Sequence, residues 1–151
     1  MILVVSVSII KDKELLMIEE KRDSGINQWN FPSGRIEKNE DIMVAAIREV
    51  KEETGLDVEL LLTTGVYNFT SDSSDQVILF HFIGEIVSGE VSLREEAITY
   101  FKWVHSRDIL AMTDGSLRNA KVIRQITKNI INRNFYSTAL FNRDLLTSHS
   151  E

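Results

Sequence analysis

Glu49, Glu52 and Glu53 are the residues of this sequence whose type and spacing are best suited to chemistry. Residues three and four apart on a helix lie side by side, so Glu49 would face both other carboxylates if the segment is helical. Like charges at this spacing destabilise a helix by roughly 0.2–0.5 kcal/mol per pair. The cluster makes physical sense if Mg²⁺ lies among the oxygens, because this ion binds carboxylates and takes substrate phosphates as co-ligands. The spacing therefore favours a magnesium site, in which Mn²⁺ could substitute.

A helix face that simply points into solvent is the competing interpretation, and for charge runs it is the commoner one. Two neighbouring features favour the metal site. Apolar residues recur at helical spacing on the other side of the segment, so the acidic edge is well defined. They are Met43, Ala46, Ile47 and Val50. The turn at Ser33 and Gly34 precedes the segment, and its backbone carbonyl groups could complete a metal shell.

The segment from about Glu40 to Thr54 has the start and the end of a helix. Asn39 can cap its N-terminus, and Gly55 stands where a left-handed C-terminal cap is expected. Pro32, the only proline, fixes its own backbone and disfavours a helical conformation for the residue before it. The sequence therefore predicts a short rigid strand that leads through a turn into the acidic helix.

The remaining pattern predicts a domain that mixes strands and helices. Strands are expected at 4–10, 14–20, 57–67, 76–87 and 99–104, and helices at 106–112, where Ser106 would be the cap, and at 117–132. This order indicates the α+β class, with a mixed α/β/α sandwich as the arrangement. We expect one domain over residues 1–134. The tail at 135–151 is too apolar to stay exposed, so we expect it to pack on the domain or to form a homodimer contact.

The composition limits the partners of the chain. The net charge is −6 and no basic stripe is present, which argues against a long nucleic acid. A small phosphorylated ligand stays compatible, because a divalent metal can invert the local charge. The apolar start, ten residues long, is shorter than the about 20 residues of a membrane span and lacks the basic region of a signal peptide. We therefore expect a cytoplasmic protein without a membrane segment, and the absence of cysteine excludes disulfides and thiolate sites.

The segment from Gly34 to Leu56 carries a family resemblance. It matches the Nudix box, G-x5-E-x7-R-E-U-x-E-E-x-G-U, at every defined position: Gly34, Glu40, Arg48, Glu49, Val50, Glu52, Glu53, Gly55 and Leu56. A chance match has a probability of about one in 10⁸ per start position. The chain thus resembles the Nudix hydrolases, in particular the MutT-like group, and the neighbouring elements extend the resemblance from residue 1 to about 133. The resemblance implies the Nudix fold, in which the box helix and a C-terminal helix flank a mixed sheet.

The resemblance also implies an activity and a set of roles. The activity is Mg²⁺-dependent hydrolysis of a pyrophosphate bond in a nucleoside diphosphate linked to another group, X. Glu52 and Glu53 would be the principal metal ligands, and Glu49 would be a further ligand or the general base. The carbonyl of Ser33 would be another ligand. Arg48 would hold the glutamates in place and would belong with Glu49 and Glu52 to the catalytic set.

A later loop often supplies one more acidic residue in this family. Glu95 and Glu96 are the candidates here, and we favour Glu96; an exposed loop is the alternative interpretation. Gly34 would permit the loop geometry around the metal and, with Arg35, would contact the substrate.

The identity of X is less well marked. The proline typical of ADP-ribose hydrolases is absent at 71–73, and Tyr67 comes too early to mark a dinucleoside polyphosphate hydrolase. A purine nucleoside triphosphate or an oxidised nucleotide is therefore favoured, and a sugar nucleotide or ADP-ribose-type substrate is the alternative. Asn119 could read a purine edge, although a helix cap is the commoner role. Phe31 and Phe80 could stack on the base, although strand aromatics more often belong to the core.

Two readings from other classes compete with the enzyme. A non-catalytic nucleotide-sensing Nudix module would show damage in the glutamate set, and here no glutamate of the box is missing. A Ca²⁺- or Mg²⁺-binding structural protein would explain the acidic edge but not the spacing of Gly34, Arg48 and Gly55.

Overall fold

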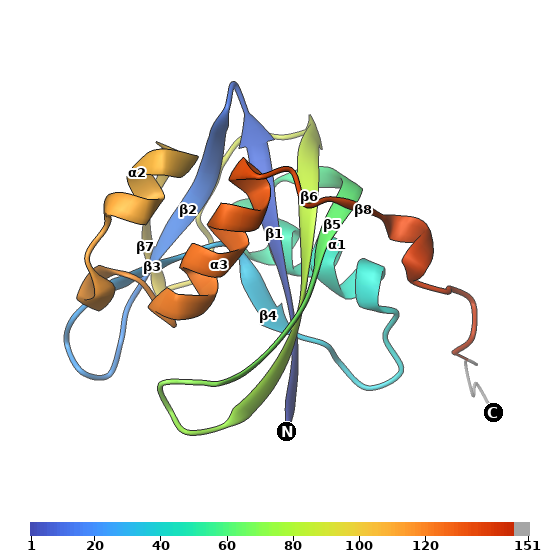
Figure 1. Cartoon of the computed structure of the whole chain (residues 1–151), viewed down its shortest axis with the longest axis horizontal. Coiled ribbons are helices and arrows are strands. Elements are labelled where there is room, and N and C mark those ends of the chain that lie inside the picture. Colours follow the sequence, from blue (N-terminus) through green and yellow to red (C-terminus); the bar gives the residue numbers. More distant parts are fainter. Residues whose placement is uncertain (147–151) are drawn as a thin grey trace.

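The computed structural model describes residues 1–146 and builds them around a mixed β-sheet with helices on both sides (Figure 1). The strands are β1 (Ile2–Lys11), β2 (Glu14–Glu20), β3 (Gln28–Asn30), β4 (Ser33–Arg35), β5 (Asp57–Thr70), β6 (Gln76–Ser88), β7 (Ile98–His105) and β8 (Tyr136–Ser137). The helices are α1 (Ile42–Thr54), α2 (Ser106–Ala111) and α3 (Ala120–Ile131), with 3₁₀ turns η1 (Asp114–Ser116) and η2 (Thr138–Leu140). The α+β prediction is confirmed.

The sheet has the strand order β3-β2-β1-β6-β5-β8, and β4 and β7 pair with β1 and β2. β1 runs parallel to β6, and the other strand pairs are antiparallel. β1 is central and buried on both faces, which explains why its sequence reads as a nearly continuous apolar run. No helix among residues 1–146 is long and apolar enough to cross a membrane.

Each face of the sheet packs a separate core. On the α1 side, Val7 and Phe82 pack with Ala46 and Val50 of the helix. On the α3 side, the buried residues are Leu15, Met17, Phe31, Tyr67, Val77, Leu79, Val104, Ile109, Leu117, Ile123 and Ile126. Because side chains alternate along a strand, neighbouring residues of β1 and β6 serve opposite cores.

The helix starts differ from the prediction. Asp41, not Asn39, caps α1, and its Oδ2 accepts hydrogen bonds from the backbone N–H groups of Met43 and Val44 at 3.0 and 3.1 Å. Asn39 instead adopts a left-handed turn with φ of 60°. The prediction of Gly55 as the left-handed C-terminal cap, with φ of 77°, is confirmed.

The later helices also begin elsewhere than expected. His105, not Ser106, caps α2 through its ring nitrogen Nδ1. The predicted helix at 117–132 begins only at Ala120, after η1, and its N-cap Asn119 is left-handed with φ of 50° and makes no side-chain cap.

The part of the tail that the structure describes lies along the outer edge of the sheet. β8 pairs with β5 through Leu62↔Ser137 and Thr63↔Tyr136. Phe141 packs on Phe82 with ring centroids 4.9 Å apart. The homodimer contact stays a prediction, and residues 147–151 of the expected tail lie outside the described residues.

Candidate active site

Arg48 organises the acidic edge of α1. Its Nε and Nη2 donate to the two carboxylate oxygens of Glu40 at 2.6 and 2.9 Å. Its Nη1 donates to Glu49 at 2.9 Å and to Glu52 at 3.1 Å. These charge-assisted bonds lower the pKa of Glu40 and raise that of Arg48, so the guanidinium stays charged. Nη2 also donates to the backbone carbonyl of Arg35 at 3.1 Å, which ties α1 to β4.

Glu53 is the buried carboxylate of the site, with 5% of its surface exposed. Its Oε1 accepts a hydrogen bond from the backbone N–H of Ser33 at 2.7 Å. Burial raises the pKa of Glu53 well above its ordinary value, and the charges of Glu20, Glu49 and Glu95 raise it further. Several like charges therefore converge on one buried group.

Glu49 lies against β4. A Cβ atom added at Gly34 would overlap the Glu49 carboxylate, so the glycine leaves the space in which this side chain lies. Burial raises the pKa of Glu49, and the hydrogen bond from Arg48 opposes that rise. The group is thus a carboxylate of increased basicity held in a defined position.

The donor set fits a hard divalent cation. Within residues 1–146, no three acidic or histidine side chains already converge as a metal shell. Arg48 binds Glu49 and Glu52, and the Ser33 N–H binds Glu53, so protein donors occupy these carboxylates. Oxygen ligands with excess negative charge are the ligands that Mg²⁺ prefers.

Glu96 as the additional acidic residue stays a prediction, and the electrostatics of the site point to its neighbour Glu95 as the second candidate. Glu95 is the one whose charge acts on both Glu49 and Glu53. Both Glu95 and Glu96 are exposed on the loop before β7.

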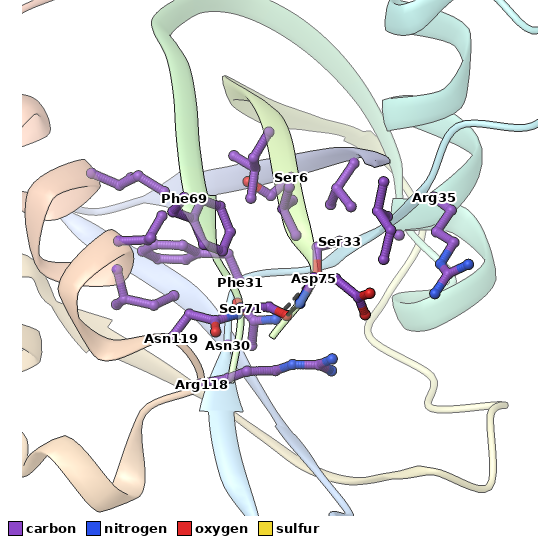
Figure 2. Close-up of a pocket in the computed structure, with 18 of the residues that line it drawn as sticks. Ser6, Asn30, Phe31, Ser33, Arg35, Phe69, Ser71, Asp75, Arg118 and Asn119 are labelled. Carbon is purple, nitrogen blue, oxygen red and sulfur yellow. Dashed lines mark hydrogen bonds between the residues drawn. The ribbon is translucent and has the colours of Figure 1, made fainter. Parts of the chain in front are cut away.

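A pocket opens beside this site on the α3 face of the sheet (Figure 2). Gly34 and Arg35 line it on the β4 side, and Asn119 lines it on the α3 side. Its apolar walls come from β1, β5, β6 and α3, and include Val4, Phe69, Leu79, Val122 and Ile126. A pocket with apolar walls on one side and polar groups next to the glutamate helix on the other suits a ligand with a flat apolar part and a phosphorylated part.

The two predicted stacking aromatics lie in different places. Phe31 lines the pocket but is fully buried, and its ring tilts against His81 with centroids 5.3 Å apart. Phe80 points to the opposite face of the sheet, where its ring meets Phe141 edge-on at 5.9 Å. Phe80 therefore does not line the pocket, and the hypothesis that it stacks on the base is wrong.

Asn119 is tied to the hairpin between β5 and β6. Its Oδ1 accepts from the backbone N–H of Asp72 at 3.1 Å, and its own N–H donates to Asp72 Oδ2 at 3.3 Å. This reciprocal pair joins the hairpin loop to the start of α3 beside the pocket. The side-chain oxygen of Asn119 thus binds the hairpin loop. This structural role differs from both expected roles, a helix cap and a contact with a purine base.

Several polar residues of the pocket escaped the sequence analysis. Glu20, Asn30 and Arg118 line it, and Ser6 forms part of its floor. The alternation of Ser6 and Ser8 with valine and isoleucine in β1 was the available signal, because a polar strand position needs a buried partner. The partner is His81, whose Nδ1 lies 2.5 Å from Ser6 Oγ and whose Nε2 lies 2.7 Å from Ser8 Oγ.

His81 should make the stability of the protein depend on pH. Burial lowers its pKa from 6.5 to about 3, so below pH 6.5 the unfolded chain binds a proton that the folded chain refuses. We expect this residue to cost about 2–3 kcal/mol of unfolding free energy between pH 6.5 and 4.5. Urea unfolding at both pH values measures the loss, and His81→Asn should lack this part of it. Equal losses in both proteins would contradict the assignment.

Comparison with known proteins defines the class. A mixed sheet between an arginine-organised glutamate helix and a second helix is the arrangement of the Nudix domain, and the NUDIX domain family model matches residues 2–126. The chain belongs to the Nudix family. It is 25% identical to a NUDIX hydrolase from Nitrosomonas europaea, with a TM-score of 0.84 over 94% of this chain and 96% of that one. A MutT protein from Methanosarcina mazei is 26% identical, with a TM-score of 0.74 over 88% and 94%.

Curated relatives carry different substrate names. Nudix hydrolase 2 of Arabidopsis thaliana is 30% identical over 77% of this chain and 42% of its own length. An ADP-ribose pyrophosphatase of Methanocaldococcus jannaschii is 33% identical over 58% and 52%. A putative 8-oxo-dGTP diphosphatase of Bacillus subtilis is 28% identical over 65% and 62%. The chain thus spans about half the length of these relatives.

Proposed function

We propose that this chain hydrolyses a pyrophosphate bond in a nucleoside diphosphate linked to X, with Mg²⁺ as the cofactor. The observation that carries the proposal is the position of the glutamate cluster. Its carboxylates lie around Arg48 and β4, where the pocket changes from apolar walls to polar groups. A nucleoside would occupy the apolar part, and its phosphates would reach the acidic end.

The residues that would hold Mg²⁺ are Glu52 and Glu53, joined by Glu49 and Glu95. Ser33 is a further candidate through its backbone carbonyl. When bound, the metal would neutralise charge on the pyrophosphate oxygens and lower the pKa of a bound water. Arg48 keeps the carboxylates in place by its bonds to Glu40, and Glu49, whose pKa burial raises, suits the acceptance of a proton.

A purine nucleoside triphosphate or an oxidised nucleotide is the substrate class we favour. The Bacillus subtilis relative is named for 8-oxo-dGTP, which supports this class. The Methanocaldococcus jannaschii relative is named for ADP-ribose, which supports the alternative of a sugar-nucleotide or ADP-ribose-type substrate. A non-catalytic sensing module is the third candidate, and the complete glutamate set argues against it.

The test is turnover of a substrate panel with Mg²⁺, with Mn²⁺, and with a chelator. The panel contains nucleoside triphosphates, oxidised purine nucleotides, ADP-ribose, sugar nucleotides and dinucleoside polyphosphates. We expect metal-dependent release of a nucleoside monophosphate, with the highest kcat/KM for a triphosphate. Tight binding without turnover of any member would favour the sensing module instead.

A further inference from the structure

A chain of polar contacts runs from the start of α3 to the buried carboxylate of the site. Arg118 Nη1 lies 3.4 Å from Glu20 Oε1, and the same oxygen accepts from Asn30 Nδ2 at 3.2 Å. Asn30 Nδ2 also lies 3.1 Å from Ser33 Oγ, and the Ser33 N–H donates to Glu53 at 2.7 Å. Arg118 thus lies at one end of this network and the Nudix-box residue Glu53 at the other.

This network holds Arg118 in place and leaves donors of its guanidinium available to a ligand. Its backbone N–H donates to the carbonyl of Trp29 at 3.0 Å, which fixes its starting point. Figure 2 shows the side chain extended from the α3 side toward the side of the pocket that carries Ser33 and Arg35. A guanidinium has five donors, and Glu20 is the one acidic partner within 4.0 Å in the described part of the chain. The remaining donors keep the fork geometry that matches a phosphate group.

The charge of the pocket explains why such a cation matters. Apart from Arg35, Arg118 is the only basic residue among the described residues that line it. Glu20 lines its acidic end, and Glu49 and Glu53 contact Gly34 and Ser33, which also line it. A polyphosphate that enters this end meets carboxylates, so any phosphate that a metal does not neutralise needs a cation of the protein.

We propose that Arg118 is a specificity-determining residue that binds an anionic X group, such as the terminal phosphates of a nucleoside triphosphate, and that Glu20 is its positioning residue. The proposal rests on the proposed function, because it names which X that site prefers. The apolar walls serve a base and need no cation, whereas Arg118 contacts Glu20, which Asn30 and Ser33 link to Glu53. A sugar as X carries no charge and would gain little from Arg118.

The test compares substrates with charged and neutral X. Arg118→Met should raise KM for a nucleoside triphosphate by about 10- to 100-fold, the effect of losing hydrogen bonds to a charged group. It should leave kcat, and KM for a sugar nucleotide, within about threefold. Arg118→Lys should recover part of the loss, because it keeps the charge and loses the fork. Arg107→Met removes an exposed arginine from α2 and serves as the matched control.

Glu20→Gln tests the positioning role. It should raise KM for the triphosphate less than Arg118→Met does, and the two changes together should cost no more than Arg118→Met alone, because both act through one contact. Additive effects would overturn the role of Glu20. An equal rise of KM for charged and neutral X, or no rise for either, would overturn the role of Arg118.

A binding measurement tests the role of Arg118 independently of whether the protein hydrolyses its ligand. Calorimetry with an α,β-methylene nucleoside triphosphate and with the matching monophosphate, both with Mg²⁺, needs no turnover. Arg118→Met should weaken binding of the first and spare the second. That result would support Arg118 even if the wild-type protein hydrolysed nothing, whereas equal weakening of both would overturn it in an active enzyme.

Discussion

Replacing Glu53 with glutamine is expected to lower kcat/KM about 10³-fold, the cost of removing one group that organises the charge of a transition state. The same change should raise the melting temperature in metal-free buffer. Burial holds the pKa of Glu53 well above its usual range, so an ionised Glu53 destabilises the folded chain at neutral pH. Glutamine removes that charge, and its side-chain oxygen can still accept the hydrogen bond from the Ser33 N–H.

Magnesium should reverse the order of stability. Mg²⁺ at a hundredfold excess over its Kd should raise the melting temperature of the wild-type protein by about 5–10 °C. The Glu53→Gln protein should respond much less, because a ligand of the metal is lost. Differential scanning fluorimetry without and with Mg²⁺ measures the metal-free melting temperature and its rise with the metal. Steady-state kinetics on the preferred nucleotide measure the loss of kcat/KM.

Two further variants distinguish the loss of a metal ligand from the mere loss of a negative charge. Glu90→Gln removes one negative charge at an exposed position and should change neither activity nor the response to Mg²⁺. Glu52→Gln removes a carboxylate whose side chain is 46% exposed, so it should lose activity without the gain in metal-free stability. A Glu53→Gln protein that kept full Mg²⁺-dependent turnover would show that Glu53 holds no metal.

The acidic helix could be predicted in detail because its determinants are local. The apolar stripe, the Gly55 cap and the pair of Arg48 with Glu52 all lie within a few turns, and the structure has that pair at 3.1 Å. The sequence predicts the N-cap at Asn39 and the structure has it at Asp41, because aspartate and asparagine are both good N-cap residues. Asn39 takes the left-handed turn instead, which asparagine tolerates better than most residues.

The rest of the site depends on contacts between distant residues. Arg118 and Glu20 are 98 positions apart, and Ser6 and His81 are 75 apart. The alternation along β6 could be read from the sequence, but the face that carries the pocket could not. The orientation of β6 in the sheet places His81 on the face with the pocket and Phe80 on the face that the tail covers. Likewise, only the folded loop before β7 distinguishes Glu95 from Glu96.

Gly34→Ala is expected to lower kcat about 10²-fold without removing any functional group, because misplacement of a catalytic group by about 1 Å has this effect. The new Cβ would overlap the Glu49 carboxylate, so the side chain of Glu49 must move away from β4. The atoms that move are the far end of a flexible side chain, so the free energy of unfolding should change little. Steady-state kinetics and urea unfolding measure the two effects.

Gly115→Ala is the matched control, because a Cβ there meets no atom within 4 Å and the exchange of residue types is the same. It should leave kcat unchanged. The double variant Gly34→Ala with Glu49→Ala should be no less active than Glu49→Ala alone, because both changes act on one carboxylate and effects on a shared group are not additive. If the double variant were instead a further hundredfold slower, Gly34 would act through something other than Glu49. Non-additivity would show that the box glycine serves catalysis by leaving space for that carboxylate.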